Sequence, residues 1–313
     1  MAITEISTAN REEWLALRKG YIGGSDAAAV LGLSEYTSPY SLWAEKTGRV
    51  PGFEGNISTE VGNYLEDMVA HLWMKETGKK VRRKNRTLVN SDYPWPCANL
   101  DRVVEGERAL LEIKTTTSLP VMRQIKGGEY PDRWYCQMMH YLAVTGYERA
   151  YLAALVNCRE LRIWVLERDD AEIKALMEAE ERFWLHVTDD TPPPLDGSDA
   201  STEALETIYA ESAAEAGDVD LFGREVLLDE RAQIQTSIKE LEKRATEIEN
   251  IIKADMGDSP KGHAGPYTVT WATQERRSFD AKTFGAKNPD IDLEPYYKKS
   301  ISRPFKVTAK KGA

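Results

Sequence analysis

The 313-residue chain has little cysteine and no long apolar segment. Its three cysteines, Cys97, Cys136 and Cys158, are widely separated, which argues against a small secreted fold held by disulfides. No apolar run approaches the roughly 20 residues that a membrane helix needs. The first residues are polar and do not have the basic and then apolar order of a signal peptide. We therefore expect a cytoplasmic protein with one large domain, or one domain and a sizeable extension.

The chain also lacks a positive net charge. Its formal charge of -10 argues against a protein that coats nucleic acid nonspecifically, because such proteins carry a strong basic excess. Basic residues are nevertheless concentrated in two segments, 75–86 and 298–313. Each segment is either a nucleic-acid-binding patch on an acidic body or an ordinary solvated face or tail.

Hydrophobic periodicity predicts an α/β or α+β core with a mixed central sheet flanked by helices. Capping residues and 3.6-residue spacing predict helices over residues 8–19, 27–31, 38–48, 60–77, 132–145 and 171–187. Strands are predicted over residues 81–89, 98–104, 109–116, 149–156 and 160–166.

A proline-rich acidic linker over residues 191–202 separates this core, residues 1–190, from an extension over residues 203–313. Within the extension we expect strands at 267–273 and 305–308, and a basic tail. A heptad seam predicts a helical arm over residues 224–255, a hairpin arm or a short coiled coil. The seam steps by 4, 3, 4, 3 and 4 residues through Ile234, Ile238, Leu241, Ala245, Ile248 and Ile252.

The most informative motif is an acidic pair on two strands joined by a tight polar turn. Asp101 falls on the first strand, residues 105–107 supply the turn, and Glu112 and Lys114 share one face of the second strand because side chains alternate. Ile113 points the other way, into a core. Two converging carboxylates repel each other unless a cation lies between them, and oxygen ligands suit Mg²⁺ or Mn²⁺.

With three further motifs, this pattern resembles the lambda-exonuclease-like, YqaJ-type viral recombinase nucleases of the PD-(D/E)XK superfamily. The resemblance spans residues 10–190 and is carried by residues 14–26, the helix around Glu66, Asp101 with residues 112–114, and residues 135–141. It implies a restriction-endonuclease-like fold, two Mg²⁺ ions for which Mn²⁺ substitutes, and 5′-to-3′ digestion of one strand of duplex DNA. It also implies a ring, commonly a homotrimer, through which the DNA is threaded.

The same resemblance assigns roles at the metal centre. Asp101 would bridge the two ions, and Glu112 with the backbone carbonyl of Ile113 would complete the tighter site. Glu66 would help to hold the second ion, although the alternative is an ordinary exposed helix carboxylate. Lys114 would orient or deprotonate the attacking water and offset charge on the phosphate.

Arg18, Ser25 and Gln137 resemble the family's residues for a terminal 5′-phosphate. The residues themselves favour Ser25, because a serine before an alanine-rich helix is an N-cap, and free amides at a helix N-terminus attract anions. Most serine N-caps bind nothing, and Asp26 beside a phosphate is unfavourable. Tyr141 lies one helical turn from Gln137 and would position the site.

The family's strand-separating wedge has only Ile57 as a candidate here. Three scattered cysteines cannot supply the four thiolates of an iron-sulfur cluster, and the histidines lack zinc spacing, so we expect neither. The leading hypothesis is a phage or prophage exonuclease that leaves 3′ tails for a single-strand annealing protein. A structure- or site-selective endonuclease with the same metal centre remains an alternative, as does a noncatalytic DNA-end-binding protein.

Overall fold

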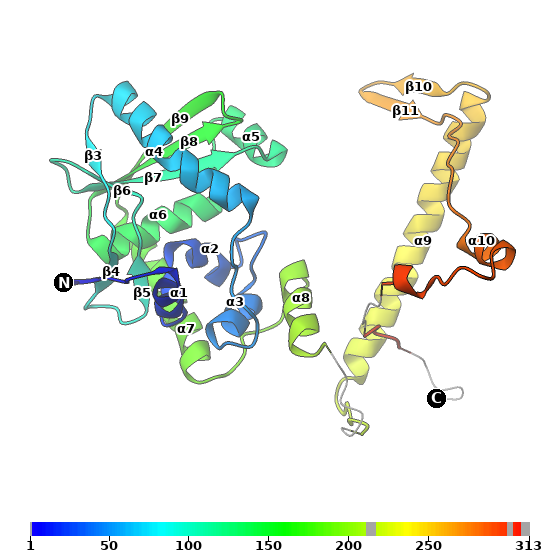
Figure 1. The fold of residues 1–313 in the computed structure, drawn as a ribbon, viewed down its shortest axis with the longest axis horizontal. Helices are drawn as coiled ribbons and strands as arrows, with labels where there is room; N and C mark the ends of the chain where they lie inside the picture. Colours follow the sequence, from blue (N-terminus) through cyan, green and yellow to red (C-terminus); the bar gives the residue numbers. More distant parts are fainter. Residues whose placement is uncertain (1, 211–216, 299–302, 308–313) are drawn as a thin grey trace. The chain divides into compact units, whose positions relative to one another are not determined.

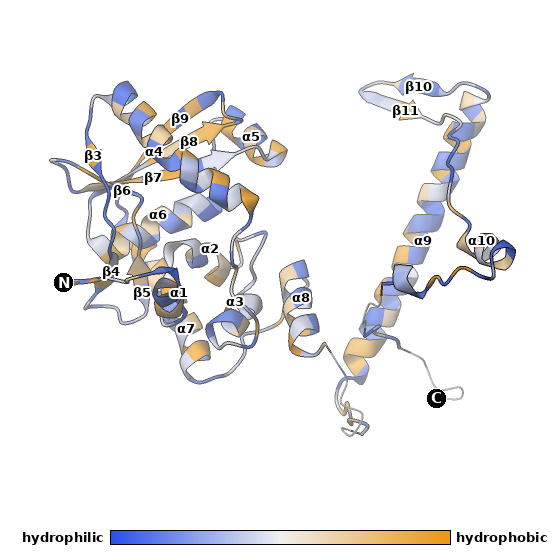
Figure 2. Cartoon of the chain, in the orientation of Figure 1, coloured by the Kyte–Doolittle hydropathy of each residue, from blue (hydrophilic) through white to orange (hydrophobic). Residues whose placement is uncertain are grey.

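A computed structural model describes residues 2–210, 217–298 and 303–307. The chain divides into two compact units, residues 1–210 and 211–313 (Figure 1). Figure 2 shows hydrophobic residues concentrated on the central strands of the first unit. Among the described residues, no helix is both long enough and apolar enough to cross a membrane.

The N-terminal unit is built on a mixed five-stranded sheet, as predicted. The strand order is β3-β6-β7-β8-β9, with β7 and β8 parallel and the other neighbours antiparallel. The β6–β7 connection is the predicted tight turn, and Gly106 within it has a positive φ of 78° that favours glycine. The strands are β3 (Val81–Arg82), β6 (Arg102–Val104), β7 (Ala109–Thr116), β8 (Arg149–Val156) and β9 (Glu160–Glu167).

Helices cover both faces of this sheet (Figure 1). Helix α4 (Ile57–Thr77) packs on one face, where Leu111 and Ile113 of β7 are buried. Helix α6 (Asp132–Thr145) packs on the other, and α7 (Asp170–Thr188) lies against α6. The parallel strands β7 and β8 are connected through α6 and the short helix α5 (Leu119–Lys126), which the sequence reading did not predict.

A second, four-stranded sheet changes the predicted strand pattern. Its order is β1-β4-β5-β2. The single strands predicted at 81–89 and 98–104 are therefore wrong, because each divides into two short strands that pair in different sheets. Asp101 consequently lies in the bend before β6 and not on a strand. The strands are β1 (Ile3–Ile6), β2 (Ile22–Gly23), β4 (Thr87–Asn90) and β5 (Pro96–Ala98).

Short helices fill the space beside the second sheet. Helix α8 packs against α3, and its Ser201 hydroxyl donates to the Ser38 hydroxyl at 2.8 Å. This contact places α8 in the N-terminal unit, which extends to residue 210. The elements are α1 (Arg11–Lys19), η1 (Gly24–Asp26), α2 (Ala27–Val30), α3 (Pro39–Lys46) and α8 (Asp199–Ile208).

The C-terminal unit contains the predicted helical arm, α9 (Glu225–Met256), followed by a two-stranded hairpin. The strand expected at 305–308 is wrong for residues 305–307, which form no regular element, and Thr308 lies outside the described residues. Most of the basic tail lies outside them too. The other elements are β10 (Lys261–Ala264), β11 (Tyr267–Thr270), α10 (Ala281–Lys287) and η2 (Glu294–Tyr296).

Candidate active site

Three of the predicted catalytic residues converge at the end of β7. Glu112 and Lys114 share the face that looks toward α6, and the Lys114 ammonium donates to Glu112 Oε1 at 2.7 Å. Asp101 reaches the same place from the bend before β6, where its Oδ2 accepts the Ile113 backbone N–H at 2.7 Å. The alternation of β7 and the bend at residue 101 therefore bring both carboxylates and the lysine together.

The two carboxylates are poorly compensated as anions. Burial raises the pKa of Asp101 well above its ordinary value, and the charge of Glu112 raises it further. Burial also raises the pKa of Glu112, although Lys114 opposes that shift. Glu112 Oε2 is buried and has no hydrogen-bond partner among the described residues. A divalent cation would relieve the repulsion and satisfy this oxygen, so the donor set fits Mg²⁺ or Mn²⁺.

Glu66 lies near this pair on α4 but has an arginine partner. The Arg102 guanidinium contacts the Glu66 carboxylate and donates to Asp67 Oδ1 at 2.6 Å. The charge of Glu66 contributes to the raised pKa values of Asp101 and Glu112, so its carboxylate is within electrostatic reach of both. Binding a second ion would require Glu66 to exchange Arg102 for the metal.

No group of three histidine, cysteine, aspartate or glutamate side chains forms a closed metal site in the ranges that the structure describes. Asp101 and Glu112 supply two carboxylates. The third candidate carboxylate, that of Glu66, forms an ion pair with Arg102. Both Cys97 and Cys136 are buried, whereas Cys158 is exposed. The expectation that the protein holds neither zinc nor an iron-sulfur cluster stays a prediction.

Helix α6 brings Gln137 and Tyr141 into the site. Lys114 donates a second hydrogen bond to Gln137 Oε1 at 2.7 Å, and the Gln137 amide donates to the Tyr141 hydroxyl at 3.0 Å. Gln137 therefore touches Lys114, the predicted catalytic lysine, directly. The predicted pairing of these two residues across one helical turn is confirmed.

Tyr141 in turn packs against the turn that carries Ser25. A Cβ atom added to Gly24 would lie only 2.4 Å from Cε1 of the Tyr141 ring. Ser25 is exposed next to this close contact, and its hydroxyl accepts a hydrogen bond from Arg18 at 3.0 Å. A continuous chain of contacts thus runs from Glu112 through Lys114, Gln137 and Tyr141 to the turn that holds Ser25, which in turn contacts Arg18 of α1.

Asp26, which sequence reasoning regarded as unfavourable beside a phosphate, points away from solvent and is neutralised. It accepts from Lys46 Nζ at 2.7 Å, from Arg18 at 3.3 Å and from the Gly23 backbone N–H at 3.0 Å. Burial alone would raise the pKa of Asp26, but Lys46 and Arg18 together lower it. The Asp26 carboxylate therefore shapes the turn and leaves the exposed surface to Ser25 and Arg18.

His140 anchors α6 from behind the site. Its Nδ1 lies 2.7 Å from Oε1 of Glu180 on α7, and its Nε2 lies 2.9 Å from the Cys97 carbonyl oxygen. Both side chains are fully buried. His140 therefore packs behind the site.

Sequence reasoning missed Arg102 and Lys46, since neither carries a motif. Arg102 follows Asp101 directly, and Lys46 ends a helix far away in sequence, so only the fold reveals their partners. Ile57, the wedge candidate, is 79% exposed at the start of α4.

Comparison with known proteins identifies the family. Residues 13–148 match the YqaJ-like viral recombinase domain. Over 306 residues the chain is 38% identical to the uncharacterized protein YqaJ of Bacillus subtilis (strain 168), covering 96% of this chain and 95% of that protein. The chain belongs to the YqaJ-like viral recombinase family. Because the alignment covers nearly all of both proteins, it includes the C-terminal unit of this family member.

Solved structures show that this family member shares the fold of alkaline exonucleases. The crystal structure of an alkaline exonuclease from Laribacter hongkongensis has a TM-score of 0.51 and 23% identity, covering 57% of this chain and 94% of that chain. The crystal structure of the same protein in complex with dAMP has a TM-score of 0.50 and 22% identity over the same shares. The predicted mixed α/β architecture is confirmed.

Proposed function

We propose that this protein is a Mg²⁺-dependent exonuclease that digests one strand of duplex DNA from its 5′ end and leaves a 3′ single-stranded tail. The observation that carries the proposal is the contact chain from Glu112 and Lys114 through Gln137 and Tyr141 to the turn bearing Ser25, and from Ser25 to Arg18 of α1. It joins a phosphodiester-cleaving centre to a candidate site for a chain end. Membership of the viral recombinase family and the fold of alkaline exonucleases support it.

At the metal centre, Asp101, Glu112 and the carbonyl of Ile113 would hold one ion, and Asp101 with Glu66 a second. The ions would supply Lewis acidity and a bound water of lowered pKa. Lys114, held between Glu112 and Gln137, stands where it can orient that water or take its proton. Its positive charge would also offset charge that develops on the phosphate.

At the chain end, Arg18 and Ser25 would bind a terminal 5′-phosphate. A guanidinium offers paired donors that match phosphate oxygens, and the exposed Ser25 hydroxyl lies beside it. Lys46 cancels the charge of Asp26, so the carboxylate does not repel the phosphate. Gln137, in contact with Lys114, would link the chain end to the scissile bond.

A substrate panel tests this proposal. Purified protein with Mg²⁺ is incubated with linear duplex bearing a 5′-phosphate, the same duplex bearing a 5′-hydroxyl, and a closed circle. We expect loss of one strand from the phosphorylated linear duplex and a much slower loss from the hydroxyl form. Cleavage of the circle would favour an endonuclease, and an inert mixture would favour the end-binding protein. The ring and the annealing partner stay predictions.

A further inference from the structure

Helix α9 is long, yet it packs against very little. It has 32 residues, and none of them is buried by the rest of the described chain. A lone helix in water is only marginally stable, and protein helices depend mainly on packing an apolar face. Within the C-terminal unit, Phe305 reaches α9 only near its start, where the Arg231 guanidinium lies 5.4 Å from its ring. The helix therefore needs a partner surface.

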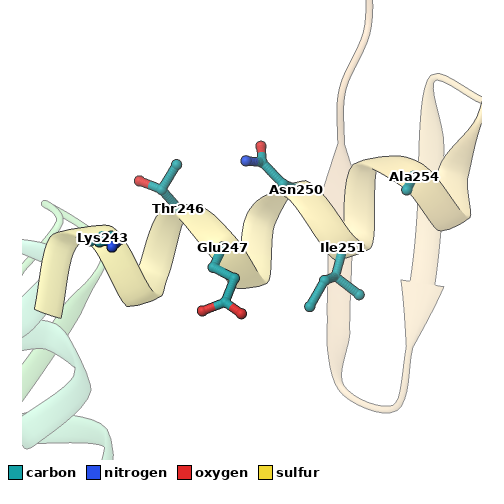
Figure 3. A pocket seen from close by; sticks show the side chains of 6 residues that line it. All are labelled: Lys243, Thr246, Glu247, Asn250, Ile251 and Ala254. Carbon is teal, nitrogen blue, oxygen red and sulfur yellow. The ribbon is translucent and has the colours of Figure 1, made fainter. Parts of the chain in front are cut away.

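An exposed apolar seam shows where that partner would bind. With Ile238 assigned to heptad position a and Leu241 to position d, the two are 48% and 70% exposed. Outside the seam the helix carries polar side chains such as Lys243, Thr246 and Asn250, together with Ile251 and Ala254 (Figure 3). A seam with a strict 3.5-residue repeat fits another helix that has the same repeat. The full seam is Ile234, Ile238, Leu241, Ala245, Ile248 and Ile252, of which the isoleucines and the leucine are 37–70% exposed.

We propose that α9 forms a parallel, in-register coiled coil with α9 of a second copy of this chain. In that arrangement Arg244 at position g faces Glu249 at position e of the other copy, an attractive pair. An antiparallel pairing over the same seam would place Arg244 opposite Arg244 and Glu242 opposite Glu242. The charges beside the seam therefore match a copy of this helix in one orientation only.

The ion pairs that Arg244 and Glu249 form within α9 compete only weakly with pairing to a second copy. Arg244 contacts Glu247 at 2.7 Å, and Glu249 contacts Lys253 at 3.2 Å, both within α9. Both pairs are exposed, and exposed ion pairs within one helix contribute little to stability. They would exchange readily for contacts at the edge of a buried seam. Isoleucine at both a and d positions is compatible with coiled coils of more than two strands. The coiled coil would therefore hold two or more copies of α9.

Disulfide trapping in the full chain tests this pairing independently of the proposed function. In a Cys158→Ser background, which removes the exposed cysteine, Ile234→Cys is compared with Thr236→Cys two residues away at the outward f position. A parallel coiled coil brings the two cysteines at 234 within bonding distance. An antiparallel one separates them by about 27 Å, at 1.5 Å per residue over the seam. We expect a covalent dimer from Ile234→Cys under mild oxidation and little from Thr236→Cys.

No dimer from Ile234→Cys, or equal yields from both variants, would overturn the proposal. A charge exchange then tests the register. Adding Arg244→Glu to the Ile234→Cys chain should lower the covalent yield several-fold, and adding Glu249→Arg as well should restore it. An unchanged yield in the single variant, or no recovery in the double variant, would contradict the parallel register. Because the readout is a bond within the arm, association of the nuclease cores does not produce it.

Discussion

At the residue scale, the contacts of Lys114 make it the most informative side chain of the site to replace. Its ammonium is held at 2.7 Å by both Glu112 and Gln137, in contact with a carboxylate that has an unsatisfied oxygen. Replacing it should remove proton transfer and charge stabilisation while the protein stays folded. We expect Lys114→Ala to slow DNA digestion by about 10²- to 10⁴-fold. The exposed Lys174→Ala, with circular dichroism of both variants, is the matched control, and digestion at the normal rate by folded Lys114→Ala would contradict the role.

Lys46 is expected to act on stability in a pH-dependent way. The pKa of Asp26 is lowered in the folded protein, so the contribution of Asp26 to stability is present above its ordinary value of 3.8 and lost as the pH falls below it. In Lys46→Met, only Arg18 and the Gly23 backbone N–H would oppose the effect of burial on the pKa of Asp26, and the charged Asp26 becomes costly. We expect a loss of about 3 kcal/mol near neutral pH that shrinks toward pH 5 as Asp26 gains a proton.

Urea unfolding of wild type and Lys46→Met between about pH 5 and pH 8 measures this difference. Lys174→Met, at an exposed helix position, should show little difference at any pH. A Lys46→Met deficit that is the same across the range would mean that lost packing, and not the charge of Asp26, causes it.

The residues that the motifs indicated, Asp101, Glu112, Lys114 and Gln137, lie together in the structure, and their roles stay predictions. Asp101, Glu112 and Lys114 could be placed together because strand alternation and a short turn fix their relative positions. Arg102 and Lys46 could not be predicted, since their importance arises from partners far away in the sequence. Asp26 was interpreted with the wrong surroundings for the same reason: its neutralising lysine is on another helix.

At the element scale, the η1 turn and α6 approach each other so closely that no side chain fits between Gly24 and Tyr141. A Cβ on Gly24 would clash with the Tyr141 ring, whereas a Cβ on Gly23 would meet its nearest atom at an ordinary 3.6 Å. Gly24→Ala should therefore push Tyr141 away from the turn and cost about 1–3 kcal/mol. It should also weaken the preference for a 5′-phosphate, because Ser25 would shift.

Gly23→Ala is the control for this effect, one residue away. Thermal unfolding and digestion of 5′-phosphate and 5′-hydroxyl duplexes measure both consequences. Equal behaviour of the two variants would show that the turn and α6 are not coupled in the way their contact indicates.

Elements with strong periodicity were predicted well, and elements defined by their partners were not. Strands β7 and β8 and helix α6 have the predicted bounds, since each has a long apolar pattern. The segments at 81–89 and 98–104 each read as one strand because pairing partners leave no mark on local composition. Helix α8 was taken for linker and extension because its buried face is only two residues, Ser201 and Ala204.

At the scale of the whole molecule, the chain combines a nuclease-like unit with a unit built around one long helix. The likeness to alkaline exonuclease structures covers 57% of the chain, whereas the Bacillus relative aligns over 96% of it. The alignment with the Bacillus relative is therefore long enough to include the C-terminal unit, whereas the family model matches only residues 13–148. A self-associating arm would hold copies of the nuclease unit together. Its contacts would involve no residue of the proposed catalytic centre.

The most direct test of the central claim follows which end of a strand is lost first. Linear duplex with 5′-phosphate ends is labelled on the 5′ terminal nucleotide in one sample and on the 3′ terminal nucleotide in another, and digested in Mg²⁺. We predict that the 5′ label is released early as mononucleotide, while the 3′ label is retained in long single strands. With Lys114→Ala we expect release of neither label. Early release of the 3′ label, or release of the 5′ label first in long terminal fragments and not as mononucleotide, would contradict digestion from a 5′ end.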